Sequence, residues 1–313
     1  MKKKYVIPVF VPHLGCPNDC VFCNQKSISG QKKNITKEDA KKIIDEFLEE
    51  IKDREGEKEI AFFGGSFTAI EESKQEELLK LAYEYVKEGK VGSIRISTRP
   101  DYINKEILKR LKKYNVKTIE LGVQSSNDYI LQKAGRGHTF EDVKKASKLI
   151  KEAGFVLGHQ IMPGLPGDNF EIDIESAKKS IAMKPDICRI YPSLVIKDTP
   201  MEDMYNRGDY KPYSLDDAVY ISGEMLKLYN EAKIKVIRIG LQPTDTITTG
   251  KDIVSGPFHP SFRELVEGHL ICENLQIKCP NEKDVIIEVN EKDISKLYAN
   301  KKYYFNKFLS NRS

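Results

Sequence analysis

Short apolar segments alternate with longer amphipathic segments along the first 195 residues of the chain. The short segments are rich in β-branched and aromatic residues, which is typical of strands. The longer segments repeat apolar residues every three to four positions with charged residues between them, as amphipathic helices do. Strands are expected over residues 5–11, 59–63, 93–97, 117–123, 155–162 and 186–194, and helices over 36–53, 71–89, 104–115, 139–154 and 169–184.

This alternation indicates the fold class. Six strands separated by helices predict parallel strands joined by right-handed crossovers. We therefore expect an α/β protein built on a partial (β/α)6 TIM-like barrel, although periodicity alone does not exclude a flat doubly wound sheet. The first helix carries its own start signal, because Thr36 is an N-cap residue and Asp39 occupies the third helical position. In such barrels the chemistry lies in the loops after the carboxyl ends of the strands.

The regular alternation of strands and helices ends after about Ser193. Residues 195–214 form a long, turn-rich connection, which precedes an expected helix over 215–234 and a strand over 235–241. A further strand is expected near the end, over 284–289. We predict a barrel core over residues 1–195 and a small C-terminal α+β extension over 196–313, packed on the barrel.

Composition sets the compartment and the broad class. The chain has 313 residues, 31% of them charged, with a net charge of +4. This mild excess of positive charge falls short of the charge imbalance of a dedicated nucleic-acid binder.

The N-terminus partly resembles a signal peptide, because Lys2, Lys3 and Lys4 precede an apolar run. However, Pro8 and Pro12 interrupt that run and no cleavage site follows. No apolar stretch is long enough for a membrane span. We expect a cytoplasmic protein, in which clustered cysteines indicate metal binding or catalysis.

Three of the six cysteines lie within eight residues, directly after the first expected strand. Cys16, Cys20 and Cys23 follow the spacing C-x3-C-x2-C. Thiolates hold iron–sulfur clusters, and three protein ligands leave one iron of a 4Fe–4S cluster open to another ligand. The alternative is a structural zinc site that adds His13 to the same cysteines. The spacing favours the cluster, because structural zinc sites usually take ligand pairs from two loops.

With Phe22 at the aromatic position, C-x3-C-x-aromatic-C resembles the radical S-adenosylmethionine (SAM) superfamily. The resemblance implies a 4Fe–4S cluster on the three cysteines, with its open iron chelated by the amino and carboxylate groups of SAM. It also implies cleavage of SAM to methionine and a 5′-deoxyadenosyl radical, which abstracts hydrogen from a substrate. A reducing flavodoxin or ferredoxin would supply the electron.

Loops after the later strands supply the rest of the implied SAM site. The resemblance implies that the Gly64–Ser66 segment contacts the amino group of SAM and that Arg136 binds its carboxylate. It also implies that Gln160 contacts the ribose and that the loop at Gly164 contacts the adenine. Without the flanking motifs, each of these residues has a simpler interpretation. The glycine pair would be a tight turn, Arg136 a surface cation and Tyr191 a core tyrosine. The expected cofactor-binding residues are Gly64, Gly65, Ser66, Ser97, Thr98, Gln124, Ser125, Arg136, Gln160, Gly164 and Tyr191.

Other segments narrow the resemblance to the Elongator catalytic-subunit group. They include T-R-P-D-Y, R-I-Y-P-S-L-V-I-K-D-T-P-M and G-P-F-H-P-S-F-R-E-L-V; oxygen-independent coproporphyrinogen dehydrogenases are a more distant match. That group carries an acetyltransferase domain after the radical SAM part, and this chain reaches Ser313 without one. We therefore do not carry over acetyl-CoA-dependent modification of wobble uridine from the resemblance. The resemblance points to tRNA modification. A small-molecule or protein substrate, or a non-catalytic zinc or iron–sulfur binding protein, is the alternative.

Overall fold

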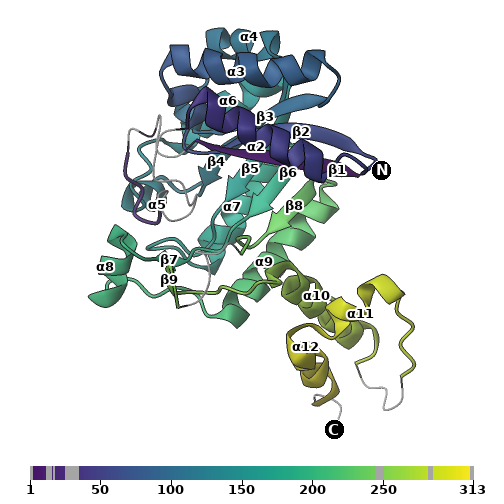
Figure 1. Ribbon diagram of the computed structural model, residues 1–313. Helices are drawn as coiled ribbons and strands as arrows, with labels where there is room; N and C mark the ends of the chain where they lie inside the picture. Colours follow the sequence, from purple (N-terminus) through teal and green to yellow (C-terminus); the bar gives the residue numbers. More distant parts are fainter. Residues whose placement is uncertain are drawn as a thin grey trace.

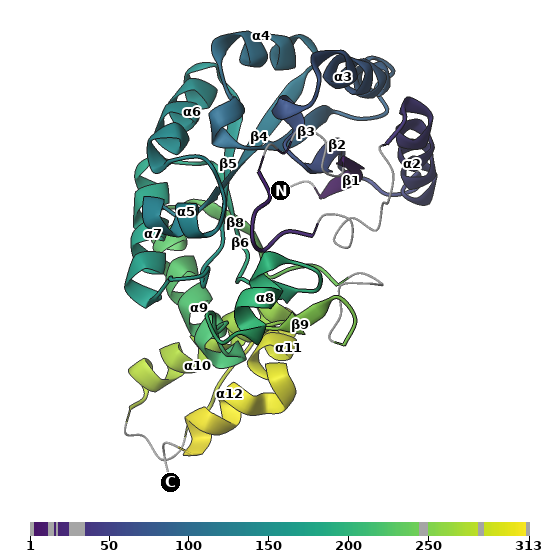
Figure 2. The same ribbon diagram turned by 90° about the vertical axis from the view of Figure 1, so that its left-hand side faces the viewer.

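A curled sheet of seven parallel strands forms the centre of the protein, with helices along its outer side (Figure 1, Figure 2). The computed structural model describes residues 3–11, 16, 18–24, 35–243, 250–280 and 285–310. In sheet order the strands are β1 (Lys4–Val11), β2 (Glu57–Gly64), β3 (Ser93–Thr98), β4 (Val116–Gln124), β5 (Val156–Ile161), β6 (Ile187–Ile190) and β8 (Lys235–Ile239). The predicted partial barrel is confirmed, and β8 adds a seventh strand to it.

Amphipathic helices connect the strands and cover the convex face of the sheet. The first begins where the sequence predicts, because the Thr36 hydroxyl accepts a hydrogen bond from the Asp39 backbone N–H at 3.0 Å. The connecting helices are α2 (Lys37–Glu50), α3 (Glu72–Lys87), α4 (Lys105–Lys113), α5 (Asp128–Lys133), α6 (Phe140–Glu152), α7 (Phe170–Ala182), α8 (Pro200–Asn206) and α9 (Leu215–Glu231). Short 3-10 turns, η1 (Phe67–Ala69) and η2 (Pro100–Tyr102), follow β2 and β3.

The two faces of the sheet differ in polarity. A parallel sheet covered by helices on both sides is apolar on both faces. Here most residues of the central strands that pack under the helices are apolar, as Ile94 and Ile96 of β3 are. Many of the residues between them are polar and line the concave face, which we call the lumen. The lumen residues used below are Glu59, Arg95, Glu120, Gln160, Arg189 and Tyr191.

The C-terminal part is mainly helical. It contains a two-stranded antiparallel pair, β7 (Val195–Ile196) with β9 (Ile253–Ser255), and then α10 (Phe262–Lys278), η3 (Glu291–Asp293), α11 (Ile294–Leu297) and α12 (Ala299–Ser310). The strand predicted over 284–289 is wrong, because described residues 285–290 form no strand and Ile286 is 93% exposed. An apolar run becomes a strand only where a neighbouring edge accepts its backbone hydrogen bonds. None of the helices in the described ranges is both long and apolar enough to cross a membrane.

Candidate active site

A cavity opens at the carboxyl ends of β1 to β5. It has about 590 Å³ of empty space, solvent at its mouth included. Its described lining consists of Cys16, Asn18, Asp19, Cys20, Cys23, Gly64, Gly65, Ser66, Ser97, Thr98, Arg99, Gly122, Gln124, Arg136 and Gln160. The fold therefore brings the three cysteines together with most of the residues expected to contact SAM.

The cysteine loop forms one wall of this cavity. Cys20 is buried, and Cys16 and Cys23 are half-buried. Val21 attaches the loop to the barrel through two backbone hydrogen bonds. Its N–H donates to the Ala134 carbonyl, and its carbonyl accepts from the Met201 N–H. Within the described ranges, no three His, Cys, Asp or Glu side chains converge closely enough to hold a single metal ion. A 4Fe–4S cluster takes its thiolates at different irons, so its ligands lie farther apart. His13, the fourth ligand of the zinc alternative, lies outside the described residues.

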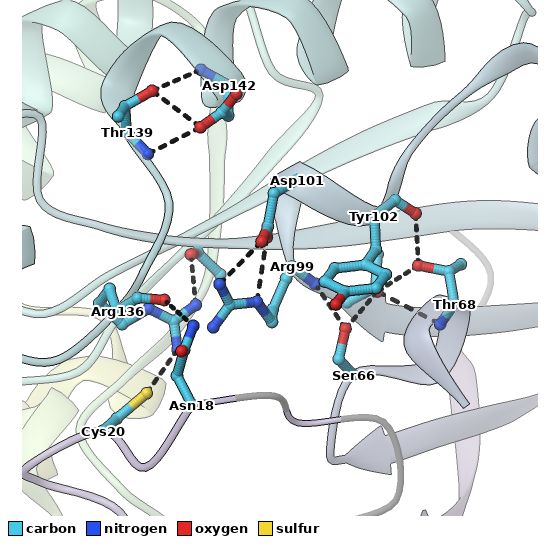
Figure 3. Close-up of polar contacts among 12 residues, drawn as sticks. Asn18, Cys20, Ser66, Thr68, Arg99, Asp101, Tyr102, Arg136, Thr139 and Asp142 are labelled. Carbon is cyan, nitrogen blue, oxygen red and sulfur yellow. Dashed lines mark hydrogen bonds and ion pairs between the residues drawn. The ribbon is translucent and has the colours of Figure 1, made fainter. Parts of the chain in front are cut away.

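Arg136 connects the cysteine wall to the sheet (Figure 3). Its Nη1 donates to the Cys20 Sγ at 3.3 Å and its Nη2 donates to the Gly122 carbonyl at 3.0 Å. The Asn18 side-chain amide donates to the Arg136 carbonyl at 3.2 Å, which fixes the backbone of the loop as well. The Arg136 Nε is buried and has no hydrogen-bond partner among the described residues. Arg136 is thus held in place while its Nε–H has no partner in the described part of the chain.

Gln124 supplies an unused acceptor to the same cavity. An irregularity in the pairing of β4 with β5 lies between Gly122 and Gln124, and Gln124 has a positive φ of 65°. Backbone in this region is strained for a residue other than glycine, and such strain gathers at functional sites. The Gln124 Oε1 is buried without a partner in the described part of the chain. A buried, unpaired donor and acceptor in one cavity are unfavourable unless a ligand satisfies both.

Hydroxyl groups tie the loop after β2 to the end of β3. The Ser66 and Thr98 hydroxyl oxygens lie 2.9 Å apart, and the Arg99 backbone N–H donates to Ser66 Oγ at 3.2 Å. Thr68 joins the same group, with its Oγ1 2.6 Å from that of Thr98. Gly64 adopts a φ of 102°, and a side chain there would press on the Val11 backbone at 3.1 Å. Because these hydroxyls bind one another, a contact of this loop with SAM through its backbone, rather than through the Ser66 side chain, stays a prediction.

Arg99 is a cavity residue that the predicted set omits. Its guanidinium is buried and donates to both carboxylate oxygens of Asp101, at 3.0 and 2.8 Å (Figure 3). His138 is buried near Arg99 and Arg136. Burial, followed by the charges of Arg136 and Arg99, lowers its pKa to about 3, so its imidazole is neutral. The position of Arg99 directly after β3 is the sequence signal that would have identified it. Asn18, Asp19 and Gly122 carried no comparable signal.

Three of the expected SAM contacts lie outside the cavity lining. The Ser125 hydroxyl faces α7, 3.3 Å from the Ser176 hydroxyl. The Gly164 carbonyl accepts a hydrogen bond from the Tyr210 hydroxyl at 2.7 Å. Tyr191 lies farther along the lumen, where its hydroxyl oxygen accepts from Arg189 Nη1 at 3.1 Å. For these three residues the contact with SAM stays a prediction.

Two carboxyl groups meet beside the Gly164 loop. Asp173 is buried and accepts hydrogen bonds from the Tyr213 hydroxyl at 2.8 Å and from the Gly164 N–H at 3.2 Å. Burial raises the pKa of Asp168 to about 6. Burial, together with the neighbouring Asp168, raises the pKa of Asp173 well above its ordinary value. In the unfolded chain both groups ionise near pH 4, so stability falls as pH rises from about 4 through about 6.

Asp168→Asn is expected to stabilise the protein at alkaline pH, because it removes one of two carboxyls that repel each other when ionised. The gain should be about 1–2 kcal/mol at pH 8, a rise in Tm of several degrees, and should shrink towards pH 4. Thermal unfolding followed by circular dichroism between pH 4 and pH 8 measures it. Asp53→Asn, at an exposed turn, is the matched control. An Asp168→Asn variant with an unchanged pH profile would contradict the raised pKa values.

Comparison with known proteins agrees with this geometry. The family model of the radical SAM superfamily matches residues 10–179, and that of the radical SAM C-terminal domain matches residues 185–271. The tRNA uridine(34) acetyltransferase of Methanocaldococcus jannaschii is 32% identical over 217 residues, covering 68% of this chain and 39% of that protein. Elongator complex protein 3 of Homo sapiens is 30% identical over 242 residues, covering 71% and 43%. The chain thus spans less than half the length of these relatives.

A solved structure supports the fold. Elp3 of Methanocaldococcus infernus, with an N-terminal deletion, superposes with a TM-score of 0.70 at 24% identity, covering 89% of this chain and 66% of that one. Radical SAM enzymes use a 4Fe–4S cluster and SAM, and the residues of the cavity fit both: three thiols form one wall, and an unpaired donor and acceptor face the interior. The chain is therefore an enzyme, which excludes the alternative of a non-catalytic zinc or iron–sulfur protein. On its matching segments, its fold and its cavity, the chain belongs to the radical SAM superfamily.

Proposed function

We propose that the protein cleaves SAM reductively and uses the product to take a hydrogen atom from a tRNA. Cys16, Cys20 and Cys23 would hold the 4Fe–4S cluster. When bound, the reduced cluster supplies the electron that splits SAM into methionine and a 5′-deoxyadenosyl radical. A reducing flavodoxin or ferredoxin delivers that electron. The observation that carries the proposal is the single cavity in which the three cysteines meet the unpaired Arg136 Nε and Gln124 Oε1.

The residues of the chain bind and orient SAM in this proposal. The Arg136 Nε donates to the carboxylate of SAM, while its two other donor groups remain on Cys20 and Gly122. Gln124 Oε1 accepts from a ligand N–H or O–H group, and the backbone of the Gly64–Ser66 loop meets the amino group. Gln160, whose Nε2 donates to Glu120 at 3.0 Å, lies at the side of the cavity nearest the lumen and reaches the ribose.

The tRNA part of the proposal rests on the relatives and on the surface beside the cysteine loop. The M. jannaschii relative is a tRNA uridine(34) acetyltransferase. In this chain Tyr129 is 57% exposed, and the Lys133 ammonium lies 4.9 Å from the centre of its ring. Both belong to α5, whose following residue Ala134 is hydrogen-bonded to the cysteine loop. An exposed aromatic ring with an adjacent lysine suits a stacked base and its phosphate.

Formation of 5′-deoxyadenosine tests this proposal. Anaerobically reconstituted enzyme is given SAM and dithionite, with and without bulk tRNA from a strain that lacks the gene, and the product is measured by mass spectrometry. We expect tRNA to increase the rate several-fold and a new modified nucleoside to appear in the digested tRNA. Ribonuclease-treated tRNA is the matched control and should not stimulate. Slow cleavage that ignores tRNA would keep the radical chemistry and exclude tRNA, leaving a small molecule or a protein as substrate.

A further inference from the structure

A network of charged side chains runs across the lumen below the cavity. The Glu59 carboxylate accepts from Lys4 Nζ at 3.1 Å and from Arg95 Nε at 2.8 Å. Arg95 also pairs with the buried Glu120, which in turn pairs with Arg189. Although burial raises the pKa of Glu120, the charges of Arg189 and Arg95 outweigh it and hold that pKa below its ordinary value. The Glu120 carboxylate is therefore ionised, and both carboxylates are paired with cations.

Arg189 is hydrogen-bonded through all three of its side-chain nitrogen atoms. Its Nε and Nη2 donate to the two carboxylate oxygens of Glu120, and its Nη1 donates to the Tyr191 hydroxyl oxygen at 3.1 Å. Since Tyr191 accepts from Arg189, its own O–H proton is available to another acceptor. In the described ranges no acceptor is present for that proton. Tyr191 is partly exposed to the lumen.

A second arginine stands beside Arg189 on the neighbouring strand. The pairing of β6 with β8 runs from Cys188–Val236 to Arg189–Arg238, so one residue of β8 is skipped. This irregularity places Arg238 on the lumen face together with Arg189, because paired residues of parallel strands point to the same side. Arg238 is partly exposed, and among the described residues it forms no hydrogen bond or ion pair. Burial raises the pKa of Tyr191, and the charge of Arg238 is among the weaker effects that oppose this rise.

The lumen consequently carries a surplus of positive charge. The network and Arg238 together contain four cations, Lys4, Arg95, Arg189 and Arg238, and two carboxylates, Glu59 and Glu120. A guanidinium in a partly desolvated site is stable only with a counter-charge or with water. The unused donors, the Arg238 guanidinium and the Tyr191 hydroxyl, point to a ligand that accepts hydrogen bonds and carries negative charge.

We propose that Arg238 and Tyr191 bind an anionic group of the substrate, a phosphate or a carboxylate, and so fix the substrate in the lumen next to SAM. The link to the cavity is Gln160, which lines the cavity and donates to the same Glu120 that holds Arg189. The inference rests on the proposed SAM chemistry, but it does not require the substrate to be tRNA. A phosphate of RNA and the anionic group of a small metabolite share the chemistry that this pair would recognise.

Arg238→Gln tests the site, because Arg238 has no partner in the described structure and its removal orphans no group. The probes are inorganic phosphate and succinate, added to the anaerobic holoenzyme with SAM at constant ionic strength. We expect at least one anion to raise the Tm of the wild type by about 2–4 °C, and Arg238→Gln to lose that rise. Lys235→Gln removes a cation from the opposite end of the same strand and should behave as wild type. Equal shifts in wild type and Arg238→Gln, or no shift in the wild type, would overturn the inference.

A second measurement separates this inference from the proposed function. With tRNA as substrate, Arg238→Gln is expected to raise KM about 10- to 150-fold relative to wild type, the effect of losing a hydrogen bond between charged groups. Lys235→Gln is expected to keep the KM of wild type. If the anion shift depends on Arg238 but tRNA has no effect on turnover, the anion site stands and the tRNA proposal fails. If tRNA stimulates wild type and Arg238→Gln with the same KM and neither shows an anion shift, the tRNA proposal stands and the anion site fails.

Discussion

We expect SAM cleavage to be abolished when Cys16, Cys20 or Cys23 is replaced by alanine. Each cysteine lines the cavity, and the cluster would lose one of only three protein ligands, which leaves it open to loss of iron. We expect 5′-deoxyadenosine formation to fall by more than about 100-fold, since even groups that only support metal ligands contribute about 10- to 100-fold. Iron and sulfide content should fall in parallel after anaerobic reconstitution.

Cys279→Ala is the matched control for these variants. Cys279 is a half-exposed thiol at the end of α10, outside the cavity lining. It should retain full iron content and full SAM cleavage. Circular dichroism should show an unchanged helix content in all four variants, because residues 16, 18–24 and 279 lie outside the helices and strands. Cleavage retained in any one of the three cavity variants would contradict the assignment of that cysteine as a cluster ligand.

Arg136→Lys should weaken SAM binding about 10- to 150-fold. The guanidinium is fixed by Cys20 and Gly122 with its Nε left unpaired, and a lysine ammonium cannot make these three contacts in one plane. A hydrogen bond to a charged group contributes about 1.5–3 kcal/mol. Loss of that free energy raises the dissociation constant of SAM by about 10- to 150-fold. Equilibrium dialysis of SAM against the reconstituted, anaerobic protein measures the change directly.

Arg110→Gln is the control for Arg136→Lys. Arg110 pairs with Glu72 on the helical surface, outside the cavity lining, so SAM affinity should be unchanged. Iron content must be measured in both variants, since Arg136 also contacts Cys20. A variant at Arg136 that keeps its cluster and binds SAM within twofold of wild type would remove Arg136 from the SAM site.

The sequence predicts the barrel and the cysteine wall well, because both depend on local pattern. Alternating strands and helices give the parallel sheet, and the cysteine spacing does not depend on how distant segments pack. The direction of a loop side chain is set by tertiary contacts instead. Ser125 follows β4 as expected, yet its hydroxyl faces Ser176 of α7, and nothing near Ser125 in the sequence indicates that neighbour.

The lumen shows a second limit of sequence reasoning. Glu120 and Arg189 lie in the middle of strands, where a charged residue looks like an interruption of an apolar run. These two residues are 69 positions apart in the sequence, so only the folded sheet reveals the network. The irregular pairing that brings Arg238 alongside Arg189 is equally invisible before the strands are placed in register.

The order of the strands has a consequence for the size of the substrate. In the described part of the chain, β1 and β8 each have one neighbour, so the sheet ends at two edges and does not close into a ring. A closed eight-stranded barrel fills its interior with its own side chains. An unclosed barrel lacks the complete ring of inward-facing side chains that fills such an interior, so the strand order by itself sets no upper limit on the size of the substrate.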